Sequence, residues 1–287
     1  MTDVEAPAAA AGSFTIGGDL TVNRMSFGAM RITGRGIWGP PKDVAECRAV
    51  LRRALELGVN FIDTADSYGP RVSEELIAET LHPYPDDLVI ATKGGLLRDG
   101  PGRWRADCSP EHLREALDGS LARLKLDRID VYQLHTVDRK VPYEDSIGAL
   151  AELQQEGKIR HIGVSNVSVA NLAKARELVE VVTVQNRYNV ADRRSEDVVD
   201  ECERLGIGFI PWAPVSAGDL AELGRSLDAI AEDHDAKVAQ IALAWLLHRS
   251  RSMLPIPGTS SVEHLEENVA AAGISLTEED LRRIEAA

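Results

Sequence analysis

The chain has 287 residues, of which 44% are hydrophobic and 27% charged, a balance typical of a soluble globular protein. Its net charge of −14 disfavours nonspecific binding to nucleic acids and to anionic membranes, because both are polyanions. No apolar run approaches the roughly 20 residues that a membrane-spanning helix needs, so we expect no such helix.

The first twelve residues combine acidic side chains with an Ala/Pro tract and lack the basic start and apolar core of a secretory signal. We expect a flexible tail over residues 1–12 and a single domain over residues 13–287. The three cysteines, Cys47, Cys108 and Cys202, show neither metal-ligand nor redox spacing, and the sequence has no H-x-x-x-H pair. These features favour reduced thiols in the cytoplasm and no metal site.

Two short apolar segments, Phe14–Ile16 and Leu20–Val22, flank Gly17-Gly18-Asp19 and predict a β-hairpin. Strand-like and helix-like segments then alternate to the end of the chain. The predicted strands are Met25–Gly28, Val59–Asp63, Leu88–Thr92, Ile129–Leu134, Ile162–Val164, Val182–Gln185, Gly208–Pro211 and Leu254–Pro257. The helical segments with the clearest start and stop signals are Asp43–Leu57, the helix opened by Ser109, Tyr143–Gln155 and Ser168–Val179.

Eight strand–helix units without a long polar linker predict an α/β fold, a (β/α)₈ TIM barrel with an N-terminal β-hairpin. A doubly wound sheet is the weaker alternative, because no G-x-G-x-x-G follows any predicted strand. In a barrel, the first polar residues after each strand share one rim, which is where active sites lie. Those residues are Asp63, Asp66, Tyr68, Lys93, His135, Ser165, Asn166, Gln185, Tyr188, Trp212, Gly258, Thr259 and Ser260.

Lys93 follows V-I-A-T, so its stem is expected in a buried strand end, where an unpaired charge is costly. Asp63 on the neighbouring strand is the natural partner. An ammonium held near Tyr68 is expected to lower the pKa of that tyrosine from its usual value of about 10 and make it a proton donor near neutral pH. Two alternatives remain open: a purely structural Asp–Lys bridge, and a Schiff-base lysine as in aldolases.

His135 ends V-Y-Q-L-H and fits two roles, orientation of a carbonyl group or an ordinary buried histidine, of which the second is favoured by position alone. Ser165, Asn166 and Gln185 offer hydroxyl and amide groups suited to a carboxamide, and Trp212 offers a flat face for a ring. Each of these residues also fits ordinary turn chemistry.

The motifs F-I-D-T-A-D-S-Y-G, A-T-K, L-H at 134–135, G-V-S-N, V-Q-N-R-Y-N, P-W-A-P and I-P-G-T-S-S-V-E-H-L-E-E-N resemble those of the aldo-keto reductase superfamily, in the same order, from about residue 14 to residue 285. The resemblance implies that Asp63, Tyr68, Lys93 and His135 form the catalytic tetrad of an NAD(P)H-dependent carbonyl reductase. Tyr68 would protonate the carbonyl oxygen as hydride arrives.

The resemblance also implies a nicotinamide cofactor. Ser165, Asn166 and Gln185 would bind its carboxamide and Trp212 would stack on its ring. Its pyrophosphate and adenosine would be held by two segments and the helix that follows, at Ala213, Pro214, Val215, Ala217, Leu220, Pro257, Gly258, Thr259, Ser260, His264, Glu267 and Asn268. Many members have a lysine where this chain has Gly258 and an arginine where it has His264, yet NADPH is favoured over NADH.

Within the superfamily, the stretch R-I-T-G-R-G-I-W-G-P-P-K looks most like bacterial pyridoxal reductases (pyridoxine 4-dehydrogenases), which makes pyridoxal a candidate substrate. Two rim loops, Arg31–Pro41 and Gly94–Ser109, are expected to place Trp38 and Trp104 as walls of the substrate pocket. The second loop carries Arg98, Arg103 and Arg105, which either select an anionic substrate or form a solvated face.

The expected partner is a small-molecule carbonyl substrate, without nucleic acid, membrane or an obligate protein partner. Two other classes stay open: a nicotinamide-binding regulatory subunit, like the potassium-channel β-subunits that share this fold, and a Schiff-base aldolase using Lys93.

Overall fold

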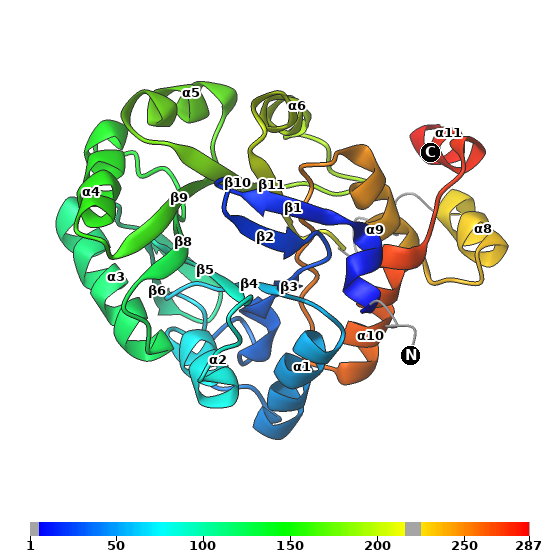
Figure 1. Cartoon of the computed structure of the whole chain (residues 1–287), viewed down its shortest axis with the longest axis horizontal. Coiled ribbons are helices and arrows are strands. Elements are labelled where there is room, and N and C mark those ends of the chain that lie inside the picture. Colours follow the sequence, from blue (N-terminus) through cyan, green and yellow to red (C-terminus); the bar gives the residue numbers. More distant parts are fainter. Residues whose placement is uncertain (1–5, 216–224, 287) are drawn as a thin grey trace.

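The computed structural model describes residues 6–215 and 225–286. Within them, a curled parallel sheet of seven strands runs in the order β11-β10-β9-β8-β5-β4-β3, with helices around its outside (Figure 1). The strands of this sheet are β3 (Phe27–Gly28), β4 (Phe61–Asp63), β5 (Val89–Gly94), β8 (Ile129–Leu134), β9 (Ile159–Ser165), β10 (Val181–Arg187) and β11 (Gly208–Trp212). The predicted (β/α)₈-type barrel is therefore confirmed.

The eighth predicted strand, Leu254–Pro257, is wrong as an assignment, although the segment takes the eighth place in the barrel. The backbone of this segment forms hydrogen bonds to both edges of the sheet. Leu254 N donates to Phe209 O on β11 at 2.8 Å, and Ser26 N, just before β3, donates to Pro255 O at 3.0 Å. Pro255 and Pro257 have no amide hydrogen, so a regular ladder cannot form here.

The helices pack against the sheet with the caps expected from the sequence. They are α1 (Val44–Glu56), α2 (Val72–Leu81), α3 (Pro110–Leu124), α4 (Tyr143–Gln155), α5 (Val169–Leu178), α6 (Glu196–Leu205), α8 (Arg225–Asp233), α9 (Val238–Arg249), α10 (Val262–Ala270) and α11 (Glu278–Glu285). Asp43, Ser109 and Ser168 accept hydrogen bonds from the backbone N–H three residues on, which fixes the starts of α1, α3 and α5. No helix of the described ranges is both long and apolar enough to cross a membrane.

The N-terminal region differs in part from the expected tail over residues 1–12. Residues Pro7–Ala11 form the 3₁₀ helix η1, in which Ala8 and Ala11 are buried, and Ala8 N donates to Leu57 O at 2.9 Å. Two further short helices are η2 (Ala29–Ile32) and η3 (Ala271–Gly273). The contact of η1 with the end of α1 explains why an Ala-rich segment without a strong local signal is ordered.

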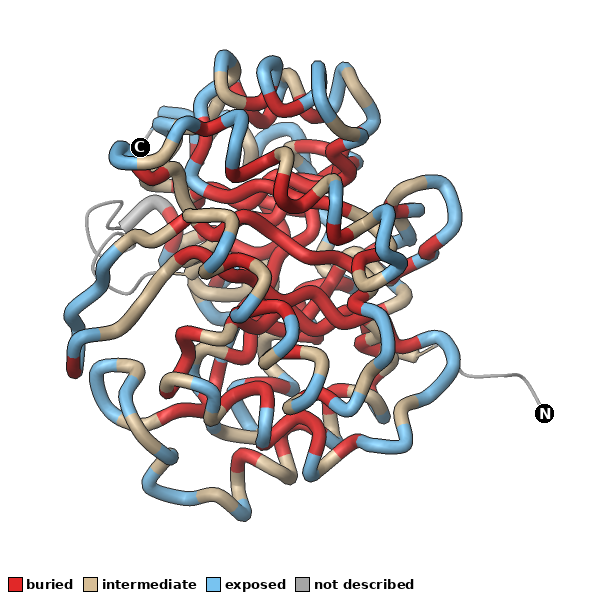
Figure 2. The backbone as a smooth tube through the Cα atoms, turned by 90° about the vertical axis from the view of Figure 1, so that its left-hand side faces the viewer, coloured by how far each residue is buried: buried red, intermediate tan, exposed pale blue. Residues whose placement is uncertain are grey.

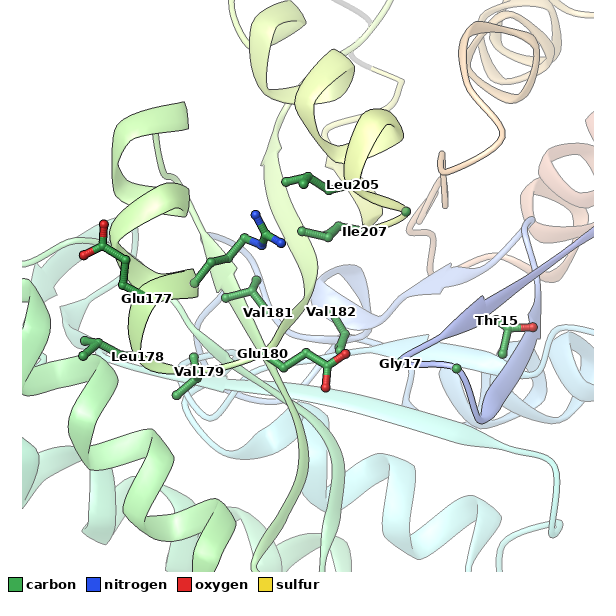
Figure 3. A pocket seen from close by; sticks show the side chains of 13 residues that line it. Thr15, Gly17, Glu177, Leu178, Val179, Glu180, Val181, Val182, Leu205 and Ile207 are labelled. Carbon is green, nitrogen blue, oxygen red and sulfur yellow. The ribbon is translucent and has the colours of Figure 1, made fainter.

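The predicted hairpin is confirmed as β1 (Ser13–Ile16) and β2 (Leu20–Asn23) and lies across one end of the barrel (Figure 1). It covers the barrel interior with Ile16, Leu20 and Val22. Beside the hairpin lies a cavity of about 530 Å³, lined by its turn and by residues 176–182 and 205–207 (Figure 3). Polar residues of the predicted rim lie in the last residues of the strands or in the loops that follow, at the other end of the barrel from the hairpin.

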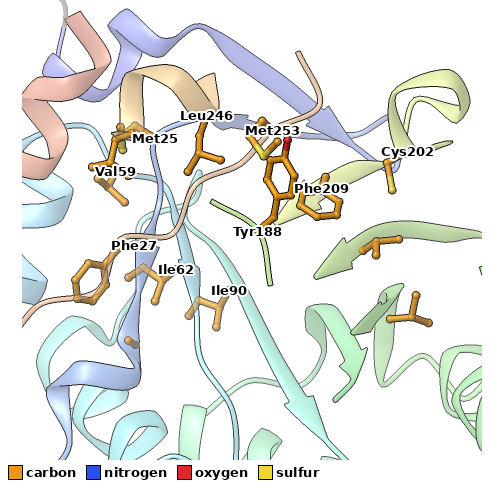
Figure 4. Packing of buried hydrophobic residues seen from close by; sticks show 14 of the residues in the cluster. Met25, Phe27, Val59, Ile62, Ile90, Tyr188, Cys202, Phe209, Leu246 and Met253 are labelled. Atoms are coloured by element: carbon orange, nitrogen blue, oxygen red, sulfur yellow. The ribbon is translucent and has the colours of Figure 1, made fainter. Parts of the chain in front are cut away.

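Buried residues concentrate in the strands and on the inner faces of the helices (Figure 2). One apolar cluster fills the barrel and includes Phe61, Val131 and Ile210. A second cluster lies between sheet and helices, where Ile62 and Ile90 alternate with the barrel-facing residues (Figure 4). Both faces of the sheet are therefore buried, as expected for parallel strands covered by helices.

One rim loop contains structure that the sequence did not predict. Within the predicted loop 94–109, strands β6 (Leu96–Gly100) and β7 (Arg103–Ala106) pair as an antiparallel hairpin. The turn at Pro101-Gly102 is a standard hairpin signal, and this hairpin stands over the carboxyl ends of the barrel strands near Tyr68 and His135, through Trp104.

Candidate active site

Three neighbouring strands bring the four predicted catalytic residues together. Asp63 is the last residue of β4, Lys93 lies near the end of β5, and His135 follows the last residue of β8. Tyr68 sits in the loop after β4, held by the hydrogen bond from its own N–H to Ala65 O at 3.2 Å. The carboxyl ends of these parallel strands meet at one edge, so residues distant in sequence share one site.

The Lys93 ammonium is the centre of this group and is completely buried. Its Nζ atom donates hydrogen bonds to Asp63 Oδ1 at 2.6 Å, to Thr64 O at 2.8 Å and to the Tyr68 hydroxyl at 3.3 Å. A buried charge is tolerated only when its donors are satisfied, and all three ammonium protons have partners here.

The other carboxylate oxygen of Asp63 is also fully used. Asp63 Oδ2 accepts hydrogen bonds from Gln133 Nε2 at 2.9 Å and from Gln185 Nε2 at 2.8 Å. Gln133 was missed by the sequence analysis, although a glutamine within the predicted strand Ile129–Leu134, two residues before His135, was a visible signal. The two amides hold the Asp63–Lys93 ion pair in one orientation.

These contacts set the protonation states of the group. Burial alone would lower the pKa of Lys93, but the adjacent Asp63 carboxylate and Tyr68 outweigh it, so the pKa lies above its usual value. The expected lowered pKa of Tyr68 is wrong for this structure: burial raises it, and the Lys93 charge opposes that rise only in part. Tyr68 is therefore a neutral phenol, and Lys93 is charged, at neutral pH.

His135 completes the group as a neutral imidazole. Burial, together with the Lys93 charge, holds the pKa of His135 well below its usual value. Its ring lies edge-on to the Tyr68 ring, with centroids 5.9 Å apart, and its Nδ1 atom lies 3.5 Å from Ser67 Oγ. A neutral imidazole in this position can donate a hydrogen bond to a carbonyl oxygen without carrying charge.

A cavity of about 510 Å³ opens at this point. It contains Asp63, Tyr68 and His135 in its wall, whereas Lys93 lies behind them. Its other lining residues come from loops around the rim: Gly28, Met30, Arg31, Ile37, Leu96, Trp104, Ser165, Asn166, Gln185, Arg187, Trp212, Ala213, Pro214, Val215, Ile256 and Gly258. Arg31 and Arg187 are cations that the sequence analysis missed.

Backbone strain gathers at this cavity. Six non-glycine residues of the described ranges have positive φ, and three of them, Ile37, Asn166 and Ala213, line the cavity. Such conformations cost on the order of 1–3 kcal/mol for residues other than Asn and persist where surrounding contacts enforce them, commonly at functional sites.

The residues predicted to bind a carboxamide lie together and are joined by hydrogen bonds. Asn166 Nδ2 donates to His135 O at 2.9 Å, and Asn166 Oδ1 accepts from Trp212 Nε1 at 3.0 Å. Ser165 Oγ donates to Gln185 O at 2.8 Å. The indole of Trp212 is thus tethered at the cavity wall, with the Arg187 guanidinium 5.4 Å from its ring centroid.

The remaining predicted cofactor residues of the described ranges lie on the segment that leads into α10 and on α10 itself. Pro257, Thr259, Ser260, His264, Glu267 and Asn268 are outside the cavity lining, and Ala217 and Leu220 lie outside the described residues. Glu267 forms an ion pair with Lys237. The first amide of α10 is not open to a ligand here, because Val262 N donates to Glu46 Oε1 at 2.9 Å.

Gly258 occupies a place where a side chain has no room. A Cβ at this position would lie 2.6 Å from Gly28 O and 3.5 Å from Arg31 Cγ. A side chain at position 258 would therefore collide with the backbone of Gly28, and Arg31 lines the same cavity.

The two tryptophans expected at the substrate side differ in position. Trp104 lines the cavity, edge-on to Tyr68 at 6.5 Å between centroids, whereas Trp38 is outside the lining and lies near Arg98. Arg98, Arg103 and Arg105 do not line the cavity. Arg103 bonds to the Asp99 backbone and Arg105 lies 3.7 Å from the Asp99 carboxylate, so neither guanidinium is directed to a ligand.

Comparisons with known proteins identify the family and the fold. The family model described as "Aldo/keto reductase family" matches residues 24–287. The chain is 52% identical over 268 residues to an uncharacterized oxidoreductase of Schizosaccharomyces pombe, covering 93% of this chain and 87% of the relative. It is 45% identical over 280 residues to pyridoxine 4-dehydrogenase of Escherichia coli, covering 95% and 97%.

Solved structures give the same result. A glycerol dehydrogenase from Gluconobacter oxydans superposes with a TM-score of 0.84 at 27% identity, covering 96% of this chain and 94% of that one. An aldo-keto reductase from Klebsiella pneumoniae, solved in complex with NADPH, superposes with a TM-score of 0.79 at 26% identity, again over 96% and 94%.

Proposed function

The chain belongs to the aldo/keto reductase family, and we propose from that premise that it reduces an aldehyde or ketone to an alcohol with NADPH, using Tyr68 as proton donor. The observation that carries the proposal is the hydrogen bond from the buried Lys93 ammonium to the Tyr68 hydroxyl, in the wall of a cavity of about 510 Å³. This arrangement supplies an acid at the point where an alkoxide would develop.

The proton comes from Tyr68. Because its pKa is raised by burial, the hydroxyl is protonated at neutral pH and can donate to a carbonyl oxygen. The Lys93 charge, 3.3 Å from that hydroxyl, stabilises the phenolate that forms as the proton leaves. Asp63 keeps Lys93 charged and in place, at 2.6 Å.

The orientation of the carbonyl group falls to His135. Its neutral imidazole lies next to Tyr68 at the same cavity wall and offers a second hydrogen bond to the carbonyl oxygen. Two donors aimed at one oxygen fix the carbonyl for reaction and stabilise negative charge on it.

The residues around the cavity fit a nicotinamide cofactor. Asn166 and Ser165 place amide and hydroxyl groups at the wall, and Trp212 offers an aromatic face held by its hydrogen bond to Asn166. Arg31 and Arg187 put positive charge there, which an anionic diphosphate needs in a chain of net charge −14. When bound, NADPH supplies the hydride.

Pyridoxal is the substrate we propose to test first. The 45% identity to pyridoxine 4-dehydrogenase of Escherichia coli supports it, since that enzyme's name gives the corresponding alcohol. We also place the protein in the cytoplasm, which its three buried free cysteines support.

A Schiff-base role for Lys93 is disfavoured by the same geometry. An amine must lose its proton to attack a carbonyl, and the Asp63 carboxylate keeps the pKa of Lys93 above its usual value. A substrate in the cavity would also meet Tyr68 and not Lys93, because Tyr68 lines the cavity and Lys93 does not.

The test is the initial rate of NADPH oxidation with pyridoxal, run beside benzaldehyde and an NADH control. A clearly higher kcat/KM for pyridoxal would support both the reductase function and this substrate. Turnover of benzaldehyde alone would retain the reductase and discard pyridoxal. Saturable NADPH binding without turnover of either aldehyde would overturn the proposal in favour of a regulatory nicotinamide-binding protein.

A further inference from the structure

Arg98 of β6 joins three backbone segments at the mouth of the cavity. Its Nη1 atom donates to Ile37 O at 2.6 Å and to Ser67 O at 3.3 Å, and its Nη2 atom donates to Gly36 O at 2.7 Å. Ser67 directly precedes Tyr68. One guanidinium therefore fixes the loop after η2, the hairpin β6–β7 and the backbone beside the proton donor relative to each other.

The same guanidinium packs on the aromatic side chains above the site. Its Cζ atom lies 3.7 Å from the centroid of Trp104 and 5.9 Å from that of Trp38. Trp104 in turn lies edge-on to Tyr68 and to His135, with centroids 6.5 and 6.3 Å away. Because Arg98 covers one face of the Trp104 indole, a substrate meets the remaining surface of that ring.

Arg98 is not placed as an anion-binding residue. It does not line the cavity, and the structure gives it no carboxylate partner within the described ranges. The hydrogen bonds from its Nη1 and Nη2 atoms end on carbonyl oxygens, and its planar fork is suited to several such bonds together with stacking on an aromatic ring. Arg98 therefore supports the residues of the cavity wall instead of binding a ligand.

Ile37 is one of the wall residues that Arg98 holds in place. It is a β-branched residue with φ of 56°, in the left-handed region that such residues avoid, and it lines the cavity. The guanidinium bonds to its own carbonyl and to that of the preceding Gly36. The Arg98 bonds act together with the turn in which Ile37 N donates to Gly34 O at 3.0 Å, so the contacts around Ile37 enforce its conformation.

We propose that Arg98 is a positioning residue that holds the wall formed by Ile37, Leu96 and Trp104 against Tyr68, and thereby makes the site selective for flat aromatic carbonyl compounds over small aliphatic ones. The inference deepens the reductase function proposed above and rests on it. Trp104 supplies an aromatic surface that a flat ring can contact and a short aliphatic chain cannot use fully.

The variants that test it are Arg98→Met and Arg98→Lys, with Arg105→Met as the matched control. Arg105 lies on the same hairpin, is about half exposed with 47% of its side-chain surface accessible, and within the described residues forms ion pairs with Asp99 and Asp107, each at 3.7 Å. Each variant is assayed with benzaldehyde and with propanal at saturating NADPH, and NADPH affinity and Tm are measured separately.

Arg98→Met is expected to raise KM for benzaldehyde about tenfold, with KM for propanal, kcat and NADPH affinity changed by less than about threefold. Arg98→Lys is expected to retain most of the defect, since an ammonium cannot bond to two carbonyls and stack on the ring in the same geometry. Arg105→Met is expected to behave as the wild type. An equal change in KM for both aldehydes, or a fall in Tm without any change in their ratio, would overturn the assignment.

A second measurement separates this inference from the function on which it rests. If the wild type turns over neither aldehyde, the proposed function fails, and titration calorimetry of benzyl alcohol into the protein with NADP⁺ decides the role of Arg98. A Kd raised about tenfold by Arg98→Met and unchanged by Arg105→Met supports it. Equal Kd values in all variants, or no binding of benzyl alcohol to the wild type, overturn it.

Discussion

The ammonium of Lys93 donates a hydrogen bond to the hydroxyl of Tyr68 across 3.3 Å, with both groups buried at the end of strands β4 and β5. Burial and the lysine charge act on the tyrosine in opposite directions, and burial prevails, so the phenol keeps its proton in the resting protein. In the mechanism proposed above, the lysine charge therefore has its largest effect as the proton leaves Tyr68, because it stabilises the phenolate that forms.

Tyr68→Phe is expected to reduce kcat by roughly 10²- to 10⁴-fold, because it removes the proton donor and little else. NADPH affinity should be retained, as measured by fluorescence titration. Tyr84→Phe is the control, since the Tyr84 hydroxyl donates to Leu124 O at 2.7 Å away from the cavity. Wild-type turnover of Tyr68→Phe at neutral pH would remove Tyr68 from the mechanism.

Asp63→Asn is expected to move the alkaline limit of activity to lower pH. Without the carboxylate 2.6 Å away, burial is no longer opposed and the pKa of Lys93 falls, so the ammonium is lost as pH rises at a lower value than in the wild type. Removal of one partner of a buried pair should also lower the free energy of unfolding by about 3–5 kcal/mol. The pH profile of kcat/KM and urea denaturation test the two effects, and an unshifted profile would show that Lys93 does not depend on Asp63.

Asp66→Asn is expected to stabilise the protein increasingly as pH rises from about 4 to about 8. Burial, reinforced by the Glu74 carboxylate, raises the pKa of Asp66 to about 8, whereas the unfolded chain ionises it near 4. Between these values only the unfolded state has released the proton, so stability of the wild type falls with pH by at most about 1.4 kcal/mol per unit. Asparagine removes that dependence.

The measurement is the difference in free energy of unfolding between Asp66→Asn and the wild type, taken at several pH values in this window. Asp127→Asn, at an exposed position, controls for the change in net charge. A difference that stays constant with pH would mean that Asp66 is ionised in the folded protein.

Gly258→Ala is expected to destabilise the protein and to weaken NADPH binding. Its Cβ would lie 2.6 Å from the backbone oxygen of Gly28, which cannot move without shifting β3. Gly258→Lys should fail for the same reason instead of improving affinity. Gly148→Ala is the control: it lies within α4 with open space around it and should stabilise by up to about 1 kcal/mol. A wild-type Tm for Gly258→Ala would show that the two segments can separate.

The sequence was sufficient for features that local chemistry dictates. Helix α1 begins after Asp43 and α4 spans Tyr143–Gln155, because capping groups and apolar spacing act within a few residues. The placement of Asp63, Lys93 and His135 in one group followed from the rule that carboxyl ends of parallel strands meet at one edge. Both the helix boundaries and the grouping of these three residues can be inferred from the order of residue types along the chain.

Other features depend on partners that no local pattern reveals. The direction of the Tyr68 pKa was mispredicted, because the extent of burial is a property of the packed site. Arg98 was predicted, with Arg103 and Arg105, either to select an anionic substrate or to lie on a solvated face. Its carbonyl partners in the other two segments lie 31, 61 and 62 positions away in sequence. The order of Pro7–Ala11 likewise depends on the end of α1.

Pro255 and Pro257 leave a weakly bonded seam in the barrel, formed by β11, residues 254–257 and β3. Each removes one amide hydrogen between β11 and β3, so opening of the barrel is expected to start there, with fast hydrogen exchange at Leu254 and Ser26. The cavity borders all three segments of this seam, through Trp212, Ile256 and Gly28. A ligand that contacts all three segments is therefore expected to slow this opening, because it would stabilise the closed barrel to an extent set by its concentration and its Kd.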